Sequence, residues 1–178
     1  MTLLHKTTDP VNYKCACCGQ EYGEMPLCFG AEFPDYYFSV PPDERESRIQ
    51  MTESLCAIDG THFFHRGRIT IPIKDYKDDL LFDVWTTISE ANFFKRDEMW
   101  EDPQRIHNEP YFGWLQTVVP GYDKTISIKT MAYESEMGMI PAIKVTEEDH
   151  PLTLDQENGI SFEEAVKRVD NILKQFHQ

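Results

Sequence analysis

The clearest pattern in the chain is an alternation of apolar and polar positions that begins at Phe63. The odd positions carry Phe63, His65, Gly67, Ile69, Ile71 and Ile73, and the even positions carry Phe64, Arg66, Arg68, Thr70 and Pro72. A period of two is that of a β-strand, whose successive side chains point to opposite faces. We therefore predict a strand in the stretch 56–73, with one apolar face that includes His65 and one basic face.

The same alternation recurs further along the chain. Residues 82–88 alternate in the same way and follow a polar turn at 75–79, which predicts a hairpin partner for the first strand. Residues 112–119, 125–133 and 140–146 read as three more strands, and 35–40 as a short one. Because the connecting turns are short, we predict an antiparallel sheet of about five or six strands.

The remaining segments of the chain carry signals of helices and loops. Residues 43–52 are rich in charges and suit a helical turn or an exposed linker, Ser89 is a candidate N-cap of a short helix, and 101–111 reads as a loop. A second short helix is predicted from His150 to Gly159, with Pro151 at its first position. Ser161 and Glu164 form a capping box that opens an amphipathic helix running to the C-terminus. We therefore predict an α+β fold with this helix packed on one face of the sheet.

The domain organisation expected from the sequence is simple. A chain of 178 residues favours a single domain with its own core. Within 1–178 we expect a loose leader at 1–12, a cysteine knuckle segment at 13–34, the sheet at 35–147 and the C-terminal helices at 148–178.

Charge and hydropathy limit the classes of partner that the protein is expected to bind. Seventeen basic and 31 acidic residues give a formal net charge of −14, which opposes binding to nucleic acids and to anionic membranes. The charge is compatible with a basic protein partner, and it also serves solubility alone. No apolar stretch approaches the roughly twenty residues of a membrane span, and the first residues lack the apolar region of a signal peptide. We therefore expect a cytoplasmic protein.

The cysteines suggest a metal site. Cys15-Ala16-Cys17-Cys18-Gly19 contains a Cys-x-x-Cys-Gly knuckle, in which two thiolates can hold one zinc ion above the turn that Gly19 permits. A structural zinc site needs four ligands, and the other two must come from Cys28, Cys56, His62 or His65. We predict Cys15, Cys18, Cys56 and His62 as the ligands, whereas the alternative is that the cysteines are small buried hydrophobic residues.

A second group of residues is suited to acid–base chemistry. His150 stands at a helix start, with Asp155 and Gln156 in the following turns, and Arg66 and Arg68 are available to bind an anion. Structural roles are the alternative: His150 caps the helix, Gln156 bonds a neighbouring loop, and the arginines pair with carboxylates. The chain has no Gly-x-Ser-x-Gly, phosphate-binding glycine loop or His-Glu-x-x-His. The aromatic run 110–115, with Trp85 and Trp100, suits either a ligand groove or the core.

Several blocks together resemble a bacterial family known as domain of unknown function 2199. The matching pieces are Cys-x-x-Cys-Gly at 15–19, Pro-Asp-Tyr-Tyr at 34–37, Phe-Phe-His-Arg-Gly-Arg-Ile at 63–69, Val-Trp at 84–85, Pro-Tyr-Phe-Gly-Trp-Leu at 110–115, and His-Pro-Leu at 150–152 with Gln156 and Gly-Ile at 159–160. The resemblance implies no activity. It implies a histidine metal ligand where this chain has Tyr22, and an aliphatic residue where this chain has His65, which favours a core position for His65.

Three classes of function follow from these observations. The first is a non-enzymatic binding or regulatory module, of the inhibitor or immunity type, whose acidic surface masks a basic partner. The second is an enzyme that acts on a small molecule through His150, Asp155, Gln156 and the two arginines. The third is a structural domain stabilised by zinc.

Overall fold

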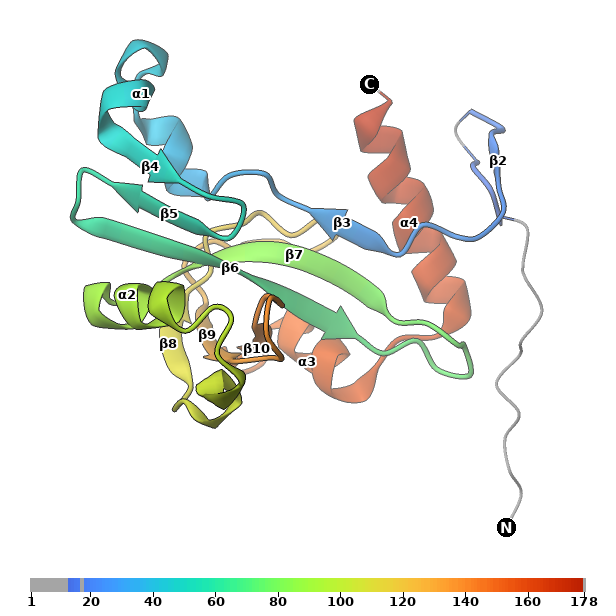
Figure 1. The fold of residues 1–178 in the computed structure, drawn as a ribbon. Coiled ribbons are helices and arrows are strands. Elements are labelled where there is room, and N and C mark those ends of the chain that lie inside the picture. The colour runs from blue at the N-terminus through green and yellow to red at the C-terminus, as the bar shows by residue number, and fades with distance from the viewer. Residues whose placement is uncertain (1–12, 17, 178) are drawn as a thin grey trace.

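The computed structural model describes residues 13–16 and 18–177. The predicted leader at 1–12 and Cys17 lie outside this range. The described elements form a mixed sheet with short helices at its margins and two helices at its C-terminal end (Figure 1). None of the described helices has the length and apolar character needed to cross a membrane.

The strand predicted from the first alternation is the centre of the sheet. It is β6 (His62–Ile71), it pairs antiparallel with β7 (Leu80–Thr87), and the predicted hairpin is confirmed. Ile69 and Ile71 are fully buried on its odd face, while Arg66 and Arg68 on its even face are partly exposed. A preceding strand, β5 (Leu55–Ile58), pairs with the first half of β6, and β4 (Ile49–Met51) pairs with β5.

The sheet is mixed and has eight strands, so the prediction of an antiparallel sheet of five or six strands was wrong. β3 (Cys28–Gly30) runs parallel to β7, and β10 (Ala142–Val145) runs parallel to β6. β8 (Tyr111–Trp114) and β9 (Lys129–Tyr133) complete the sheet beside β10. Long segments separate the strands of each parallel pair, whereas the prediction assumed short turns throughout.

The sheet also curls back on itself. Leu115, directly after β8, forms an isolated bridge with Thr86 of β7, and the backbone N–H of Gln116 donates to the carbonyl of Trp85 at 2.7 Å. β7, β6, β10, β9 and β8 therefore form a closed loop of paired strands. The approach is so close that a Cβ atom at Gly113 would collide with the carbonyl oxygen of Thr87.

The segment between β3 and β5 differs from the prediction. Residues 35–40, predicted as a strand, form the 3-10 helix η1 (Asp35–Ser39). Pro34 precedes it, and the rings of Phe33 and Tyr37 stack at 4.1 Å, an arrangement that suits one helical turn better than an extended chain. The helical turn expected at 43–52 is confirmed in its first part as η2 (Pro42–Glu44) and α1 (Arg45–Arg48), whereas residues 49–51 of the same range form strand β4.

The helices begin where their caps predict. Ser89 caps α2 (Glu90–Glu98) by accepting from the backbone of Asn92, and η3 (Pro103–His107) lies inside the predicted loop. α3 (Pro151–Asn158) has Pro151 at its first turn and ends at Gly159, whose φ is 72°. α4 (Phe162–Phe176) begins with the Ser161 side chain accepting from the N–H of Glu164. The carboxylate of Glu164 binds Arg168 at 2.8 Å, so one half of the predicted capping box is seen.

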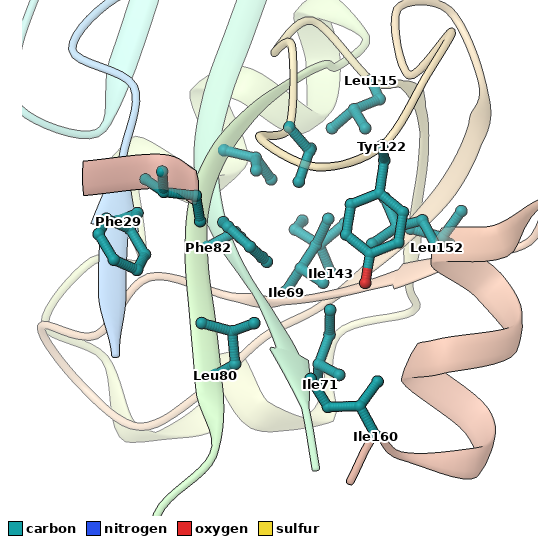
Figure 2. Packing of buried hydrophobic residues seen from close by; sticks show 14 of the residues in the cluster. Phe29, Ile69, Ile71, Leu80, Phe82, Leu115, Tyr122, Ile143, Leu152 and Ile160 are labelled. Atoms are coloured by element: carbon teal, nitrogen blue, oxygen red, sulfur yellow. The ribbon is translucent and has the colours of Figure 1, made fainter. Parts of the chain in front are cut away.

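The core has two parts. The main cluster lies between the odd face of β6 and the C-terminal helices, and Figure 2 shows Ile69, Phe82, Ile143 and Leu152 converging there. A smaller cluster on the other face of the sheet contains Val40, Cys56, Ile58, Phe64 and Trp85, covered by the segment of η1 and by β4. The C-terminal helix therefore packs on one face of the sheet, as predicted.

Cys15 and Cys18 of the predicted knuckle lie in the connection of a small hairpin. β1 (Tyr13–Lys14) pairs antiparallel with β2 (Glu21–Tyr22) beside α4 (Figure 1). Gly19 has a φ of 71°, and its N–H donates to the carbonyl of Cys15 at 2.9 Å, so this glycine permits the turn as expected. The hydroxyl of Tyr13 donates to Asp170 and fastens the hairpin to the helix.

Candidate functional site

His150 and Asp155 are both engaged in holding the C-terminal helices. Nδ1 of His150 accepts from the N–H of Leu152 at 3.2 Å, so His150 is the N-cap of α3, and its Nε2 lies 3.0 Å from the carbonyl of Asp123. Asp155 accepts from the hydroxyl of Tyr122 at 2.8 Å. Burial and this carboxylate raise the pKa of Tyr122, so the phenol stays protonated and continues to donate.

Gln156 bonds the backbone of β10. Its Nε2 donates to the carbonyl of Ile143 at 2.8 Å, and its Oε1 accepts from the N–H of Val145 at 2.9 Å. The amide thus replaces the sheet partner that β10 lacks at this point. The structural role considered for Gln156 is therefore seen, but its hydrogen bonds go to a strand instead of a loop.

The two arginines lie on the other face of the sheet. Arg68 donates to both oxygens of Asp83, at 2.6 and 3.0 Å, as the acidic composition favours. Arg66 lies over the ring of Trp85 at 6.0 Å and donates to the carbonyl of Glu53 at 3.4 Å. α3 packs against the opposite, odd face of β6. The structure therefore does not bring the arginines and His150 into one pocket.

Of the predicted zinc ligands, Cys15 and Cys18 lie in one hairpin connection, whereas Cys56 and His62 lie elsewhere in the fold. Cys15 is buried in the main cluster, and Cys56 is buried in the second cluster on the other face. Cys18 is exposed, and His62 stacks on Tyr36 with 4.7 Å between ring centroids. No group of three or more metal-ligating side chains occurs among the residues that the structure describes. Zinc thus stays a prediction without a geometric site, and metal analysis of the purified protein tests it.

His65 lies in the core, as its position on the odd face predicts. It is fully buried, and neither ring nitrogen has a hydrogen-bond partner among the described residues. Its ring meets Tyr111 edge-on at 6.1 Å. Burial, and secondly the positive charge of Arg96, hold the pKa of His65 well below its ordinary value, so the imidazole is neutral.

A buried charged cluster, which sequence reasoning missed, lies beside His65. Arg105 donates to Glu134 from Nε at 3.0 Å, and Nε of Arg96 lies 3.9 Å from the other oxygen of the same carboxylate. The two arginine side chains are 0% exposed and that of Glu134 is 1% exposed. Both guanidinium groups pack against the ring of Trp100, at 5.4 and 4.8 Å from its centroid.

This cluster joins four parts of the chain. Arg96 on α2 donates to the carbonyl of Ser54, next to β5, at 3.1 Å. Arg105 on η3 donates to the carbonyls of Trp100 and of Met139, which lies between β9 and β10. Burial lowers the pKa of Arg96 to about 10, against the opposing attraction of Glu134, so the guanidinium remains charged at neutral pH. The end of α2 is therefore held firmly against the edge of β5.

Between these two elements lies a groove, which we call the acidic groove. Its volume is about 520 Å³, and it is lined by Thr52, Glu53, Ser54, Leu55, Asp97, Glu98, Trp100 and Glu101. Four of these residues are acidic, and none of the four forms an ion pair with a described residue. The groove therefore combines one aromatic side chain with an excess of negative charge, which the buried Arg96 offsets in part through its attraction to Asp97. This composition is suited to a cationic ligand.

The protein therefore has an α+β fold with an acidic groove between α2 and the start of β5. The chain belongs to the bacterial family described as "Uncharacterized protein conserved in bacteria", domain of unknown function 2199, which matches residues 14–160. No curated protein and no solved structure matches the chain.

Proposed function

We propose that this protein is a non-enzymatic binding module whose acidic groove holds a basic segment of a partner protein. The observation that carries the proposal is the set of four unpaired carboxylates in one concave surface, from Glu53, Asp97, Glu98 and Glu101. Elsewhere in the described structure, arginines form ion pairs with carboxylates. Arg68 on β6 pairs with Asp83 on β7, and Arg168 on α4 pairs with Asp155 on α3. In the groove, the four carboxylates form no direct ion pair with a described residue, and Asp97 is attracted to the buried Arg96 without contact.

The chemistry of the groove suggests how the partner would be recognised. Lysine or arginine side chains of the partner would meet the carboxylates, and their aliphatic parts would cover Trp100. Charges of opposite sign speed association and exclude acidic competitors, and their effect declines as salt is added. A protein that acts in this way is an inhibitor, or an immunity-type protein, that masks the basic surface of its partner.

Comparison of three baits tests the proposal. The first is the wild-type protein, and the second carries Glu53→Gln, Asp97→Asn, Glu98→Gln and Glu101→Gln. The third is a control that loses the same charge at exposed acidic residues outside the groove, through Glu32→Gln, Asp43→Asn, Glu46→Gln and Glu157→Gln. Each bait is exposed to native bacterial lysate at low salt, and the captured proteins are identified.

The expected result is a basic protein that binds the wild type and the control, and that binds the groove variant at least about tenfold more weakly. Recovery of the wild-type bait alone would refute the binding role. A basic partner that binds all three baits equally would refute the groove as its site.

A further inference from the structure

A small cavity, which we call the apolar cavity, lies between the edge strand β3 and the C-terminal end of α4. Its volume is about 250 Å³, and its walls come from β3, β7, residues 117–120 and the last turn of α4. The walls include Phe29 and Phe82, which are buried, and Val118 and Phe176, which are 65% and 67% exposed. The cavity therefore has a buried apolar interior and opens to solvent beside Val118 and Phe176.

Three phenylalanine rings give the cavity a shape that suits a planar ligand. The rings of Phe29 and Phe176 are nearly parallel, with an angle of 12° between their planes and 6.5 Å between their centroids. The ring of Phe82 lies beside that of Phe29, at 6.3 Å (Figure 2). Because aromatic rings prefer stacked or edge-on neighbours at such distances, a flat aromatic ligand packs well against this set.

The walls of the cavity favour a neutral ligand over an anionic one. The charged residue in the walls is Asp83, and its carboxylate accepts two hydrogen bonds from Arg68 on the other face of the sheet. The last turn of α4, which includes Gln175, adds the partial negative charge of a helix C-terminus. The net charge of −14 acts in the same direction. An anion would therefore lose its hydration without finding a cationic partner.

One buried hydroxyl group in the walls is available to donate a hydrogen bond. Thr117 is 6% exposed, and its Oγ1 accepts from the backbone N–H of Trp85 at 2.8 Å. Within the part of the chain that the structure describes, no group accepts a hydrogen bond from this hydroxyl, so its hydrogen remains free to bind a ligand. A single polar group in an apolar pocket fixes the orientation of a ligand and gives specificity.

We propose that the apolar cavity binds a small, neutral, planar aromatic molecule that carries one hydrogen-bond acceptor. An apolar protein cavity of about 150 Å³ holds one benzene molecule, so this volume suits a fused two-ring compound of about ten non-hydrogen atoms. The rings of the ligand stack on Phe29 and Phe176, and its acceptor binds the hydroxyl of Thr117. A peptide segment is a poorer occupant, because the apolar walls leave its amide groups without partners.

This site is independent of the acidic groove. The groove is formed by the end of α2 and residues 52–55, whereas the cavity is formed by β3, β7, residues 117–120 and α4, and the two share no lining residue. The cavity proposal therefore does not rest on the proposed binding of a basic partner. Failure of either proposal can be told from failure of the other.

Equilibrium dialysis of the full-length protein with matched probes tests the proposal. Quinoline is a neutral two-ring compound whose ring nitrogen accepts a hydrogen bond, and naphthalene has the same shape without an acceptor. We expect the wild type to bind quinoline at least about fivefold more tightly than naphthalene, which is the effect of one net hydrogen bond. Quinoline-2-carboxylate, an anion, should bind more weakly than quinoline.

A pair of exposed phenylalanines provides a variant and its control. Phe176→Ala removes the ring at the mouth of the cavity and should weaken the binding of both probes about fivefold or more. Phe38→Ala removes a ring on η1 that is 63% exposed and lies outside the cavity, and it should change binding by less than about twofold. Because both rings are mostly exposed, we expect both variants to fold, and their unfolding transitions check this.

The hydroxyl of Thr117 is tested by two further variants. Thr117→Val should remove the preference for quinoline over naphthalene, whereas Thr117→Ser, which retains a hydroxyl, should preserve it. Thr117→Val also deprives the N–H of Trp85 of its acceptor. Should that variant fail to fold, the comparison of the two probes on the wild type decides.

Four results would overturn the proposal. The first is the absence of saturable quinoline binding below about 1 mM. The second is equal binding of quinoline by the wild type and by Phe176→Ala, since the site would then lie elsewhere. The third is binding of naphthalene or of quinoline-2-carboxylate as tight as that of quinoline. The fourth is a wild-type dimer in sedimentation that Phe176→Ala dissociates and Phe38→Ala does not, since a second copy would then occupy the mouth of the cavity.

Discussion

The buried carboxylate of Glu134 accepts two hydrogen bonds from Arg105, at 3.0 Å from Nε and at 2.5 Å from Nη2. Because Arg96 lies next to the same carboxylate, one negative charge serves two buried positive ones. The cost of leaving a buried charge unpaired is far greater than the net gain of the pair itself.

Removal of this charge should destabilise the fold strongly. Glu134→Gln keeps the shape of the side chain but leaves two buried guanidinium groups without a counter-ion. We expect a loss of about 3–5 kcal/mol in the free energy of unfolding, measured by urea denaturation. Glu136→Gln, an exposed neighbour, should change it by less than about 0.5 kcal/mol. Equal stability of the two variants would show that Glu134 does not hold the cluster.

The stability of the protein should fall at mildly acidic pH because of His65. Its pKa is lowered in the folded state by burial and by Arg96, so below about pH 6.5 the unfolded chain binds a proton that the folded chain does not. The contribution is fully present above the unfolded pKa and is lost as pH falls towards the folded pKa, by about 1.4 kcal/mol per pH unit. Thr86 and Tyr111 face the ring with Arg96, and neither supplies an acidic partner.

His65→Leu is the variant that isolates this effect, since it introduces an aliphatic side chain of the kind that the family resemblance implies at this position. Urea denaturation between about pH 7.5 and about pH 5 should show a shallower decline for the variant than for the wild type. Parallel declines would mean that other groups cause the acid sensitivity.

The close approach of β8 to β7 should make Gly113 intolerant of any side chain. A Cβ atom there would meet the backbone carbonyl of Thr87, which cannot rotate away. We expect Gly113→Ala to lower the free energy of unfolding by about 1–3 kcal/mol or more. Gly23→Ala is the control, because nothing lies within 4 Å of a Cβ atom at that position. If both variants unfold like the wild type, the sheet does not close in this way.

The thiols should differ in reactivity. Cys56 is 0% exposed, and burial raises its pKa to about 11, whereas Cys18 is exposed. Alkylation by iodoacetamide at mildly alkaline pH, followed by peptide mass spectrometry, should modify Cys18 at least about a hundredfold faster than Cys56, because the thiolate is the nucleophile. In denaturant the two rates should converge. Rapid native labelling of Cys56 would contradict its place in the second cluster.

The local elements were predictable where a short pattern determines them. The period of two at 63–71 predicted β6 and the burial of His65, and the residues Ser89, Pro151, Gly159 and Ser161 marked helix ends. The strand predicted at 35–40 was wrong, because a run of aromatic residues between prolines packs equally well as one helical turn. The parallel pairing of β3 with β7 and of β10 with β6 carries no local signal, since it depends on segments far apart in the chain.

The candidate sites also divide into features that local patterns predict and features that depend on distant contacts. Sequence reasoning assigned chemistry to His150 and Asp155 from their types and spacing, yet their hydrogen bonds go to the surrounding backbone and side chains. It passed over Arg96 and Arg105, which stand in polar stretches that look solvent-exposed. Their burial depends on Glu134, 29 residues after Arg105, and only the folding of the sheet brings the two together. A run of acidic residues around Trp100 was the one visible signal of the groove.

The sequence by itself determined the central hairpin of β6 and β7, the apolar face of β6, the helix caps and the excess of negative charge, because each depends on neighbouring residues or on composition. The tertiary structure decided that the sheet is mixed and closed, that Arg66 and Arg68 lie on the opposite face of the sheet from α3, that Cys15 and Cys56 are buried in different clusters, and that four carboxylates line one groove. These depend on contacts between distant segments, and the pairing of buried charges and strands across such distances is set by the packing of the whole chain.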